Sequence, residues 1–243
     1  MKWMNNMLSS LNNQKFGLTN NQLKIIAAIS MVLDHIGLVL FPGEEIFRIL
    51  GRIALPIYAF LIAEGCRHTR NRKKYLGLIA SMGIAFQVFY FVFMDDLYQG
   101  ILITFSLSIC LIYSIESFIN NKNILNRILM SLVIFGVLFV TLACPDIFGK
   151  YGFEIDYGIW GVSLPVIVYF APDHDSRVLF LSIFLGIRGF FARWTWWPLM
   201  SIPFIALYNG ERGKKNMKYF FYLFYPLHLV IIYAVAILIS ILK

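Results

Sequence analysis

The feature that most constrains this chain is a series of long apolar runs that recurs from near its N-terminus to its C-terminus. An α-helix of about 20 apolar residues crosses the hydrocarbon core of a bilayer, and several runs approach that length. The chain is 59% hydrophobic and only 14% charged, whereas soluble domains carry about a quarter charged residues. We therefore predict an all-α, polytopic helical bundle embedded in a membrane.

Nine of these runs are predicted to be transmembrane helices, and a total of eight or ten stays open because some runs are short. Proline removes a helical hydrogen bond, so Pro165, Pro198 and Pro203 are expected to break helices. The nine predicted helices cover residues 23–41, 46–64, 75–94, 100–115, 124–143, 157–171, 177–192, 194–208 and 217–242.

The charge between the apolar runs predicts the orientation of the chain. The two most basic gaps are residues 67–74 and 211–218. With nine helices, Glu44 and Glu45 lie on the opposite side from both of them. Positive charge marks the cytoplasmic side of a membrane protein, so we expect a cytoplasmic N-terminus and an external C-terminus. The same gaps account for the net charge of +8, and binding to nucleic acid is therefore not expected.

The sequence predicts one membrane domain and contains no familiar cofactor motif. A polar cytoplasmic segment, residues 1–22, is expected to precede a single integral-membrane domain, residues 23–243. Neither a disulfide framework nor a metal site is expected from the three cysteines, Cys66, Cys110 and Cys144, because they are isolated in sequence. The glycine-rich phosphate loop, HExxH and GxSxG motifs are absent from the sequence.

Several ionisable residues interrupt the apolar runs. A charged side chain near the middle of a bilayer costs about 2.5–3.5 kcal/mol, so a set of them is better explained by a polar cavity inside the bundle. A structural network of buried ion pairs is the alternative for any one of them. The residues concerned are Asp34, His35, Arg48, Arg52, Glu64, Arg188 and His228.

His35 is the strongest candidate for chemistry among these residues. It lies about 18 Å beyond the predicted start of its helix, at 1.5 Å per residue, and so in the outer half of the membrane. Arg48 and Arg52 share one helix face at a similar depth, because they are spaced i, i+4. Arg188 is expected to approach the same level. Neighbours on a helix point about 100° apart, so we expect Asp34 to pair with an arginine while His35 faces the cavity.

The basic segment 67–74 has two interpretations. As a topology signal it needs no further role, whereas as an anion site it would bind the phosphates of a donor on the cytoplasmic side. Glu64 and His68 are spaced i, i+4 and are expected to form a local pair. His228 follows Pro226 closely, and a histidine there is as often a packing residue as a ligand. The cations assigned to the donor are Arg67, Arg70, Arg72, Lys73 and Lys74, with Arg212 and Lys214 as helpers.

Five segments in this order, "DHIGLVLF", "GRIALP", "EGCRHTRNRKKY", "YNGERGKK" and "FYPLHL", together resemble the TraX family. The resemblance runs from about residue 18 to the C-terminus. Members of that family are described as conjugal-transfer or fimbrial-assembly proteins, and their best-known activity is acetylation of the N-terminal amine of a pilin subunit. The resemblance implies a multi-pass protein of the bacterial cytoplasmic (plasma) membrane.

The family is also distantly similar to integral-membrane acyltransferases, in which a histidine near the outer end of the first helix is thought essential. The resemblance carries that role onto His35, and it extends to Arg52 and to His228 in the final helix. It implies acetyl-CoA as the co-substrate and no metal. The acceptor would be an exported protein, a pilin, a lipoprotein or a glycan at the outer membrane face.

We therefore expect an acyltransferase that moves an acetyl group from cytoplasmic acetyl-CoA to an amine or hydroxyl of that acceptor. An imidazole exchanges protons near neutral pH, so His35 would be the base, with Arg52 or a freed backbone donor stabilising the oxyanion and Asp34 nearby. An acyl-histidine intermediate stays open beside direct transfer. Two alternatives stay open: a transporter or channel with a buried polar cavity, and a non-catalytic assembly protein of a conjugation or envelope system. Neither needs acetyl-CoA, and a scaffold would tolerate substitution of His35 and Arg52.

Overall fold

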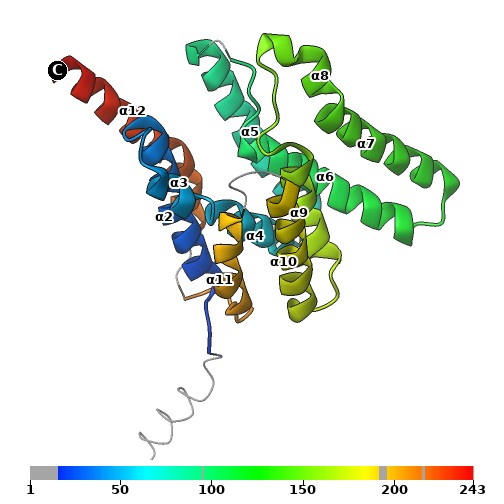
Figure 1. Ribbon diagram of the computed structural model, residues 1–243. Helices are drawn as coiled ribbons and strands as arrows, with labels where there is room; N and C mark the ends of the chain where they lie inside the picture. Colours follow the sequence, from blue (N-terminus) through cyan, green and yellow to red (C-terminus); the bar gives the residue numbers. More distant parts are fainter. Residues whose placement is uncertain (1–15, 95, 192–195, 215–216, 243) are drawn as a thin grey trace, which may run out of the picture. The chain divides into compact units, whose positions relative to one another are not determined.

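A computed structural model describes residues 16–94, 96–191, 196–214 and 217–242 of the chain (Figure 1). Regular structure in these residues is helical, apart from two isolated bridging pairs. The predicted all-α class is therefore confirmed. The helices are α2 (Asn20–Val39), α3 (Glu45–Gly51), α4 (Ala54–His68), α5 (Arg72–Met94), α6 (Ile101–Asn120), α7 (Ile124–Leu142), α8 (Cys144–Phe148), η1 (Gly149–Tyr151), α9 (Gly158–Phe170), α10 (His174–Phe191), η2 (Trp197–Ser201), α11 (Ile202–Ala206) and α12 (Lys218–Leu242).

Six helical segments of the described chain are long and apolar enough to cross a membrane. Each contains at least 19 residues, which at 1.5 Å per residue is about the thickness of a bilayer core. The chain is thus a membrane protein by this criterion, but the predicted total of about nine spans is not confirmed. The six segments are Asn20–Val39, Glu45–His68, Arg72–Val92, Ile101–Asn120, Ile124–Leu142 and Leu223–Leu242.

The three predicted spans outside this group differ from the structure for identifiable reasons. Helix α9 has only 13 residues, about 20 Å of helix, which is shorter than a bilayer core. Helix α10 has 18 residues but includes Asp175, Arg177 and Arg188. The run at 194–208 lies partly outside the described residues, and the remainder forms two short elements, η2 and α11.

The prolines explain the short elements but do not all break helices. Pro203 lies in the first turn of α11, where the missing N–H has no helical partner to lose. Pro198 lies within the short η2. Pro165 and Pro226, in contrast, lie inside α9 and α12, which continue past them. The expected break at Pro165 is therefore wrong.

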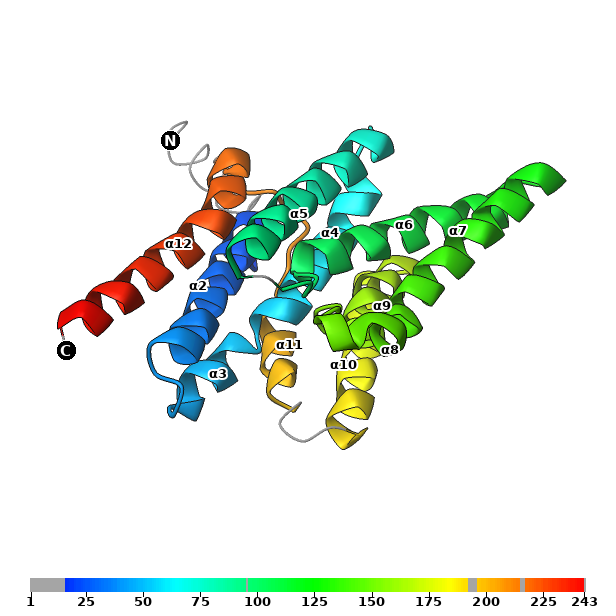
Figure 2. The ribbon, with the colours of Figure 1, turned by 90° about the horizontal axis from the view of Figure 1, so that it is seen from above.

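The chain divides into two compact units, one of residues 1–54 and 200–243 and the other of residues 55–199. The first unit holds α2, α3, α11 and α12, and α12 runs alongside α2 (Figures 1 and 2). Helix α2 begins with a capping box in which Thr19 and Gln22 bond reciprocally. Helix α3 then folds back on α2, so the unit is built around the first and last apolar helices of the described chain.

A backbone clamp joins the entry of α2 to the segment before α12. The N–H of Leu18 donates to the carbonyl oxygen of Leu207 at 2.7 Å, and Asn209 donates back to Leu18 at 3.0 Å. The N–H of Asn20 donates to the carbonyl oxygen of Glu211 at 2.8 Å. These bonds hold residues 207–212 against the start of α2, although the two segments lie near opposite ends of the sequence.

The second unit packs α6 against α5, α7 and α9, and α9 also packs against α10. Leu111, Val137 and Val162 from α6, α7 and α9 form a buried apolar core. The hydroxyl of Ser108 donates to the carbonyl oxygen of Val162 at 2.9 Å, which ties α6 to α9 inside this core. A polar side chain is stable there because its hydrogen bond is satisfied.

Candidate functional site

The first unit brings together two of the histidines that the sequence singled out. His35 of α2 and His228 of α12 have ring centroids 5.1 Å apart, with their planes at 72° to one another. His228 is buried and His35 is half-buried. Phe224 stacks on His228 at a centroid distance of 5.3 Å, which fixes the orientation of that ring. The histidine of the last helix is therefore a partner of His35.

Both imidazoles are held in the same tautomer by a bond to the preceding helical turn. Nδ1 of His35 lies 2.8 Å from the carbonyl oxygen of Met31, and Nδ1 of His228 lies 2.9 Å from that of Phe224. A carbonyl oxygen can only accept, so Nδ1 carries the proton and the neutral ring keeps a lone pair on Nε2. Nε2 of His228 is buried and has no partner among the described residues. This arrangement suits a proton acceptor or nucleophile.

The ion pair expected for Asp34 is present, and its partner is Arg48. Nη1 of Arg48 donates to Oδ2 of Asp34 at 2.9 Å, and the side chains are 35% and 17% exposed. A Cβ atom on Gly51 would lie only 2.3 Å from Cβ of Asp34, so the carboxylate side chain packs directly on the α3 backbone. The pair neutralises a charge one residue away from His35.

Ser30 is a site residue that the sequence did not reveal. Its hydroxyl is buried and donates to the carbonyl oxygens of Leu50 and Gly51, the latter at 3.2 Å. The last carbonyls of a helix lack partners within it, so Ser30 completes the end of α3. Its position one helical turn before Asp34 on the same face of α2 was the available signal. Arg52 directly follows α3, and its backbone N–H donates to the carbonyl oxygen of Arg48.

Glu64 forms a buried ion pair with a residue that the sequence did not single out. It lies in the second unit, is only 4% exposed, and its Oε1 accepts from Nη1 of Arg177 at 2.6 Å. The predicted pair with His68 is also present, at 3.8 Å from Nδ1 to Oε2. Glu64 thus belongs to a buried ion pair between α4 and α10, the alternative that the sequence left open. Sequence spacing gives no signal for Arg177, because the partner is far along the chain.

Two of the five cations assigned to the donor are already engaged in the structure. Nη2 of Arg67 donates to the carbonyl oxygens of Val168, Tyr169 and Ala171, which completes the C-terminal end of α9. Nη2 of Arg72 donates to a carboxylate oxygen of Glu116 at 2.9 Å. The other three, Arg70, Lys73 and Lys74, are exposed.

Arg188 also lies in the second unit. Its guanidinium carbon lies 5.5 Å from the ring centroid of Tyr157, a cation–π arrangement. Tyr157 has a positive φ of 59° at the N-cap of α9. Residues other than glycine rarely adopt this backbone conformation. The approach of Arg188 to the level of His35 stays a prediction.

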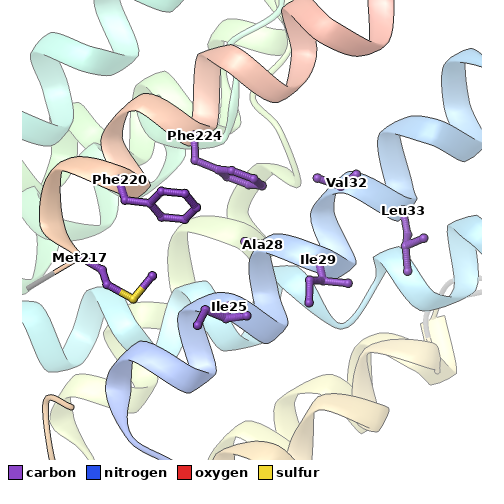
Figure 3. Close-up of a pocket in the computed structure, with 8 residues that line it drawn as sticks. All are labelled: Ile25, Ala28, Ile29, Val32, Leu33, Met217, Phe220 and Phe224. Atoms are coloured by element: carbon purple, nitrogen blue, oxygen red, sulfur yellow. The ribbon is translucent and has the colours of Figure 1, made fainter. Parts of the chain in front are cut away.

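A cavity of about 400 Å³ lies between α2 and the start of α12, within the first unit (Figure 3). This cavity has an entirely apolar lining, and the polar cavity predicted around His35 stays a prediction. Arg48 forms its ion pair with Asp34, between α3 and α2, and is not among the residues that line this cavity. Phe224 connects the cavity to the histidines, because it lines the cavity and stacks on His228. The lining residues are Ile25, Ala28, Ile29, Val32, Leu33, Met217, Phe220 and Phe224.

The helper cations Arg212 and Lys214 are exposed on the segment clamped to the start of α2. Both residues lie shortly before Met217 in the sequence, and Met217 lines one end of the cavity. Among the residues that the structure describes, no group of three or more His, Cys, Asp or Glu side chains is arranged to hold a metal ion. The site is thus a pair of imidazoles beside one ion pair, next to an apolar cavity.

Comparison with known proteins assigns the chain to a family. Residues 19–236 match the family model described as TraX protein. The chain is 29% identical over 241 residues to the probable fimbrial assembly protein FimC, serogroup H1, of Dichelobacter nodosus, covering 87% of this chain and 93% of that protein. It is 30% identical over 176 residues to an uncharacterized protein of Rickettsia prowazekii (strain Madrid E), covering 70% and 62% respectively.

No solved structure matches the chain. The family model, in contrast, covers the chain from the start of α2 to within α12, and so includes both His35 and His228. With the fimbrial assembly protein aligned over nearly its whole length, the conclusion is direct: this chain belongs to the TraX family.

Proposed function

We propose that this protein is a membrane-embedded acyltransferase that moves an acetyl group from cytoplasmic acetyl-CoA to an amine or hydroxyl of an exported acceptor. The observation that carries the proposal is the contact between His35 and His228, each with Nδ1 bound to a backbone carbonyl and Nε2 directed away from it. Two imidazoles fixed in this tautomer inside apolar helices are better suited to proton transfer than to packing alone.

In the proposed reaction, Nε2 of His35 takes the proton from the acceptor nitrogen or oxygen as that atom attacks the thioester carbonyl carbon. A bond from the acceptor to this carbon forms, and the carbonyl oxygen becomes an oxyanion. The carbon–sulfur bond then breaks, the carbonyl re-forms, and the thiolate of CoA leaves with the proton returned by His35. His228, in edge contact with His35, orients the base.

Arg52 is proposed to stabilise the oxyanion. It directly follows α3, the helix whose Arg48 pairs with Asp34 beside His35. A preorganised cation near a developing negative charge lowers the barrier, because the charge needs no rearrangement of solvent.

The donor is proposed to bind through the exposed cations of the 67–74 segment. Arg67 and Arg72 are engaged with protein groups, so the phosphates of CoA would contact Arg70, Lys73 and Lys74. Lysine binds phosphate as a point charge, and arginine binds it through paired hydrogen bonds. These three residues are therefore the ones whose removal should weaken donor binding.

The acceptor is proposed to be an exported subunit of a surface appendage. The similar protein of Dichelobacter nodosus is named a probable fimbrial assembly protein, and the TraX family is linked to conjugation and fimbrial assembly. An acetyl group on an amine of such a subunit removes a positive charge. Modification of this kind would change how subunits pack against one another.

The proposal is tested by mass spectrometry of envelope proteins from cells that carry either the wild-type gene or a His35→Ala version expressed at the same level. We expect acetylated envelope proteins with the wild type that are missing with the variant. The absence of any difference, together with failure of the purified protein to bind acetyl-CoA, would favour a transporter or a scaffold instead.

A further inference from the structure

The apolar cavity between α2 and α12 has the shape of a groove that one face of each helix lines. The α2 positions 25, 28, 29 and 32 follow helical spacing, and Met217, Phe220 and Phe224 do the same at the start of α12 (Figure 3). From Ile25 to Leu33 the groove extends about 12 Å along α2, at 1.5 Å per residue.

The lining determines what kind of group this groove can hold. All eight lining residues are apolar, so a bound group with amides or hydroxyls would lose hydrogen bonds to water without replacement. This disfavours the amide-containing arm of acetyl-CoA. Water is also poorly held in such a site, because it needs two or more polar partners. A hydrocarbon chain needs none.

Positive charge gathers at the end of the groove where the two helices begin. Lys24 precedes Ile25, and it lies close enough to Arg212 for their charges to interact. The N–H of Asn21 donates to the carbonyl oxygen of Arg212 at 3.3 Å, which holds that segment against α2. Lys214 is exposed on the same segment, which also carries one carboxylate, that of Glu211. Among the described residues, three cations and one acid thus give this end of the groove a net positive charge.

We propose that the groove binds an anionic phospholipid, with its phosphate at Lys24, Arg212 and Lys214 and one acyl chain along the α2–α12 groove. Basic residues at the membrane surface beside a gap between helices recognise such headgroups. An extended chain advances roughly 1.3 Å per carbon, from the carbon–carbon bond length, so about nine carbons fill 12 Å.

The lipid would act on the histidine pair through Phe224. This ring lines the inner part of the groove and stacks on His228, so an acyl chain in the groove would hold Phe224 against the imidazole. The inference goes beyond the proposed function. Arg212 and Lys214 are also the predicted helpers for the donor phosphates, but the apolar groove and Lys24 have no part in the proposed reaction. The inference holds whether or not the protein transfers acetyl groups.

The test is native mass spectrometry of the full chain released from detergent after equilibration with equal amounts of phosphatidylglycerol and phosphatidylcholine. A net of two positive charges at about 1 kcal/mol each predicts roughly thirtyfold preferential retention of phosphatidylglycerol. Arg212→Glu combined with Lys214→Glu should abolish the preference. Lys73→Glu combined with Lys74→Glu is the matched control, with the same change of charge on another basic segment, and should keep it.

A second variant distinguishes binding of the lipid's acyl chain from binding of its headgroup. Ile29 lies on the groove wall and is 57% exposed, so Ile29→Trp adds bulk with little disturbance of the core. We expect it to reduce retention of both lipids. Equal retention of the two lipids by the wild type, loss of preference in the Lys73/Lys74 control, or displacement of phosphatidylglycerol by acetyl-CoA would each overturn the proposal. The last result would assign the groove to the donor.

Discussion

The imidazole of His228 lies edge-on to that of His35, 5.1 Å from centroid to centroid, and this contact joins the first and last long helices of one unit. Each ring is anchored through Nδ1 to its own helix. Each ring is therefore held by its own helix, and replacement of one histidine should leave both helices in place.

The buried pair of Glu64 and Arg177 is expected to be the most sensitive ion pair in the second unit. Arg177→Leu leaves a carboxylate that is 4% exposed without its 2.6 Å partner, which should lower the free energy of unfolding by about 3–5 kcal/mol. Denaturing-detergent titration of the purified protein measures this change. Adding Glu64→Leu should recover most of the loss, because the unpaired charge is then removed.

Lys122→Leu, at an exposed position, is the control for loss of a cation. A loss of stability in Arg177→Leu no larger than in this control would show that the pair contributes nothing.

The packing of Asp34 on Gly51 predicts a large difference between two glycine substitutions. In Gly51→Ala the new Cβ would lie 2.3 Å from Cβ of Asp34, and relieving that clash should cost about 1–3 kcal/mol. A Cβ added to Gly136 in α7 would meet no other atom within 4 Å, so Gly136→Ala should stabilise its helix by up to about 1 kcal/mol. Thermal unfolding of both variants in the same detergent checks the prediction, and equal midpoints would contradict it.

Replacement of Arg67 and replacement of Lys73 and Lys74 should have different effects on stability and on the KM for acetyl-CoA. Arg67 completes the end of α9, so Arg67→Ala should lower stability by about 1–3 kcal/mol and leave the KM for acetyl-CoA unchanged. Lys73 and Lys74 are exposed, so their replacement by alanine should raise that KM by up to about fivefold for each charge with no loss of stability. The opposite assignment of the two effects would show that Arg67 binds the donor.

The sequence predicted long helices well where hydrophobicity alone decides the structure. The run at 124–143 became Ile124–Leu142, and the run at 23–41 became Asn20–Val39. The run at 46–64 became two helices, Glu45–Gly51 and Ala54–His68, because length and mean hydropathy do not show where a helix stops. The run at 194–208 became two elements of five residues each, apart from the part outside the described residues.

The candidate site was predictable where chemistry limits the choices and not where pairing is distant. Asp34 in an apolar helix requires a cation, and Arg48 supplies it. The partner of Glu64 could not be foreseen, because Arg177 lies on a helix far along the chain. The apolar cavity beside the histidines was not predicted, because its lining residues carry no chemical signal that distinguishes them from other apolar residues of the two helices.

The most direct test of the central claim is the initial rate of acetyl transfer from radiolabelled acetyl-CoA to envelope acceptor in membrane vesicles that contain folded His35→Ala. His68→Ala, which removes a histidine whose side chain is 72% exposed, is the matched control. The account predicts a loss of about 10²–10⁴-fold for His35→Ala and a rate near wild type for His68→Ala. A His35→Ala protein that unfolds at the wild-type temperature and transfers acetyl groups at the wild-type rate would contradict it.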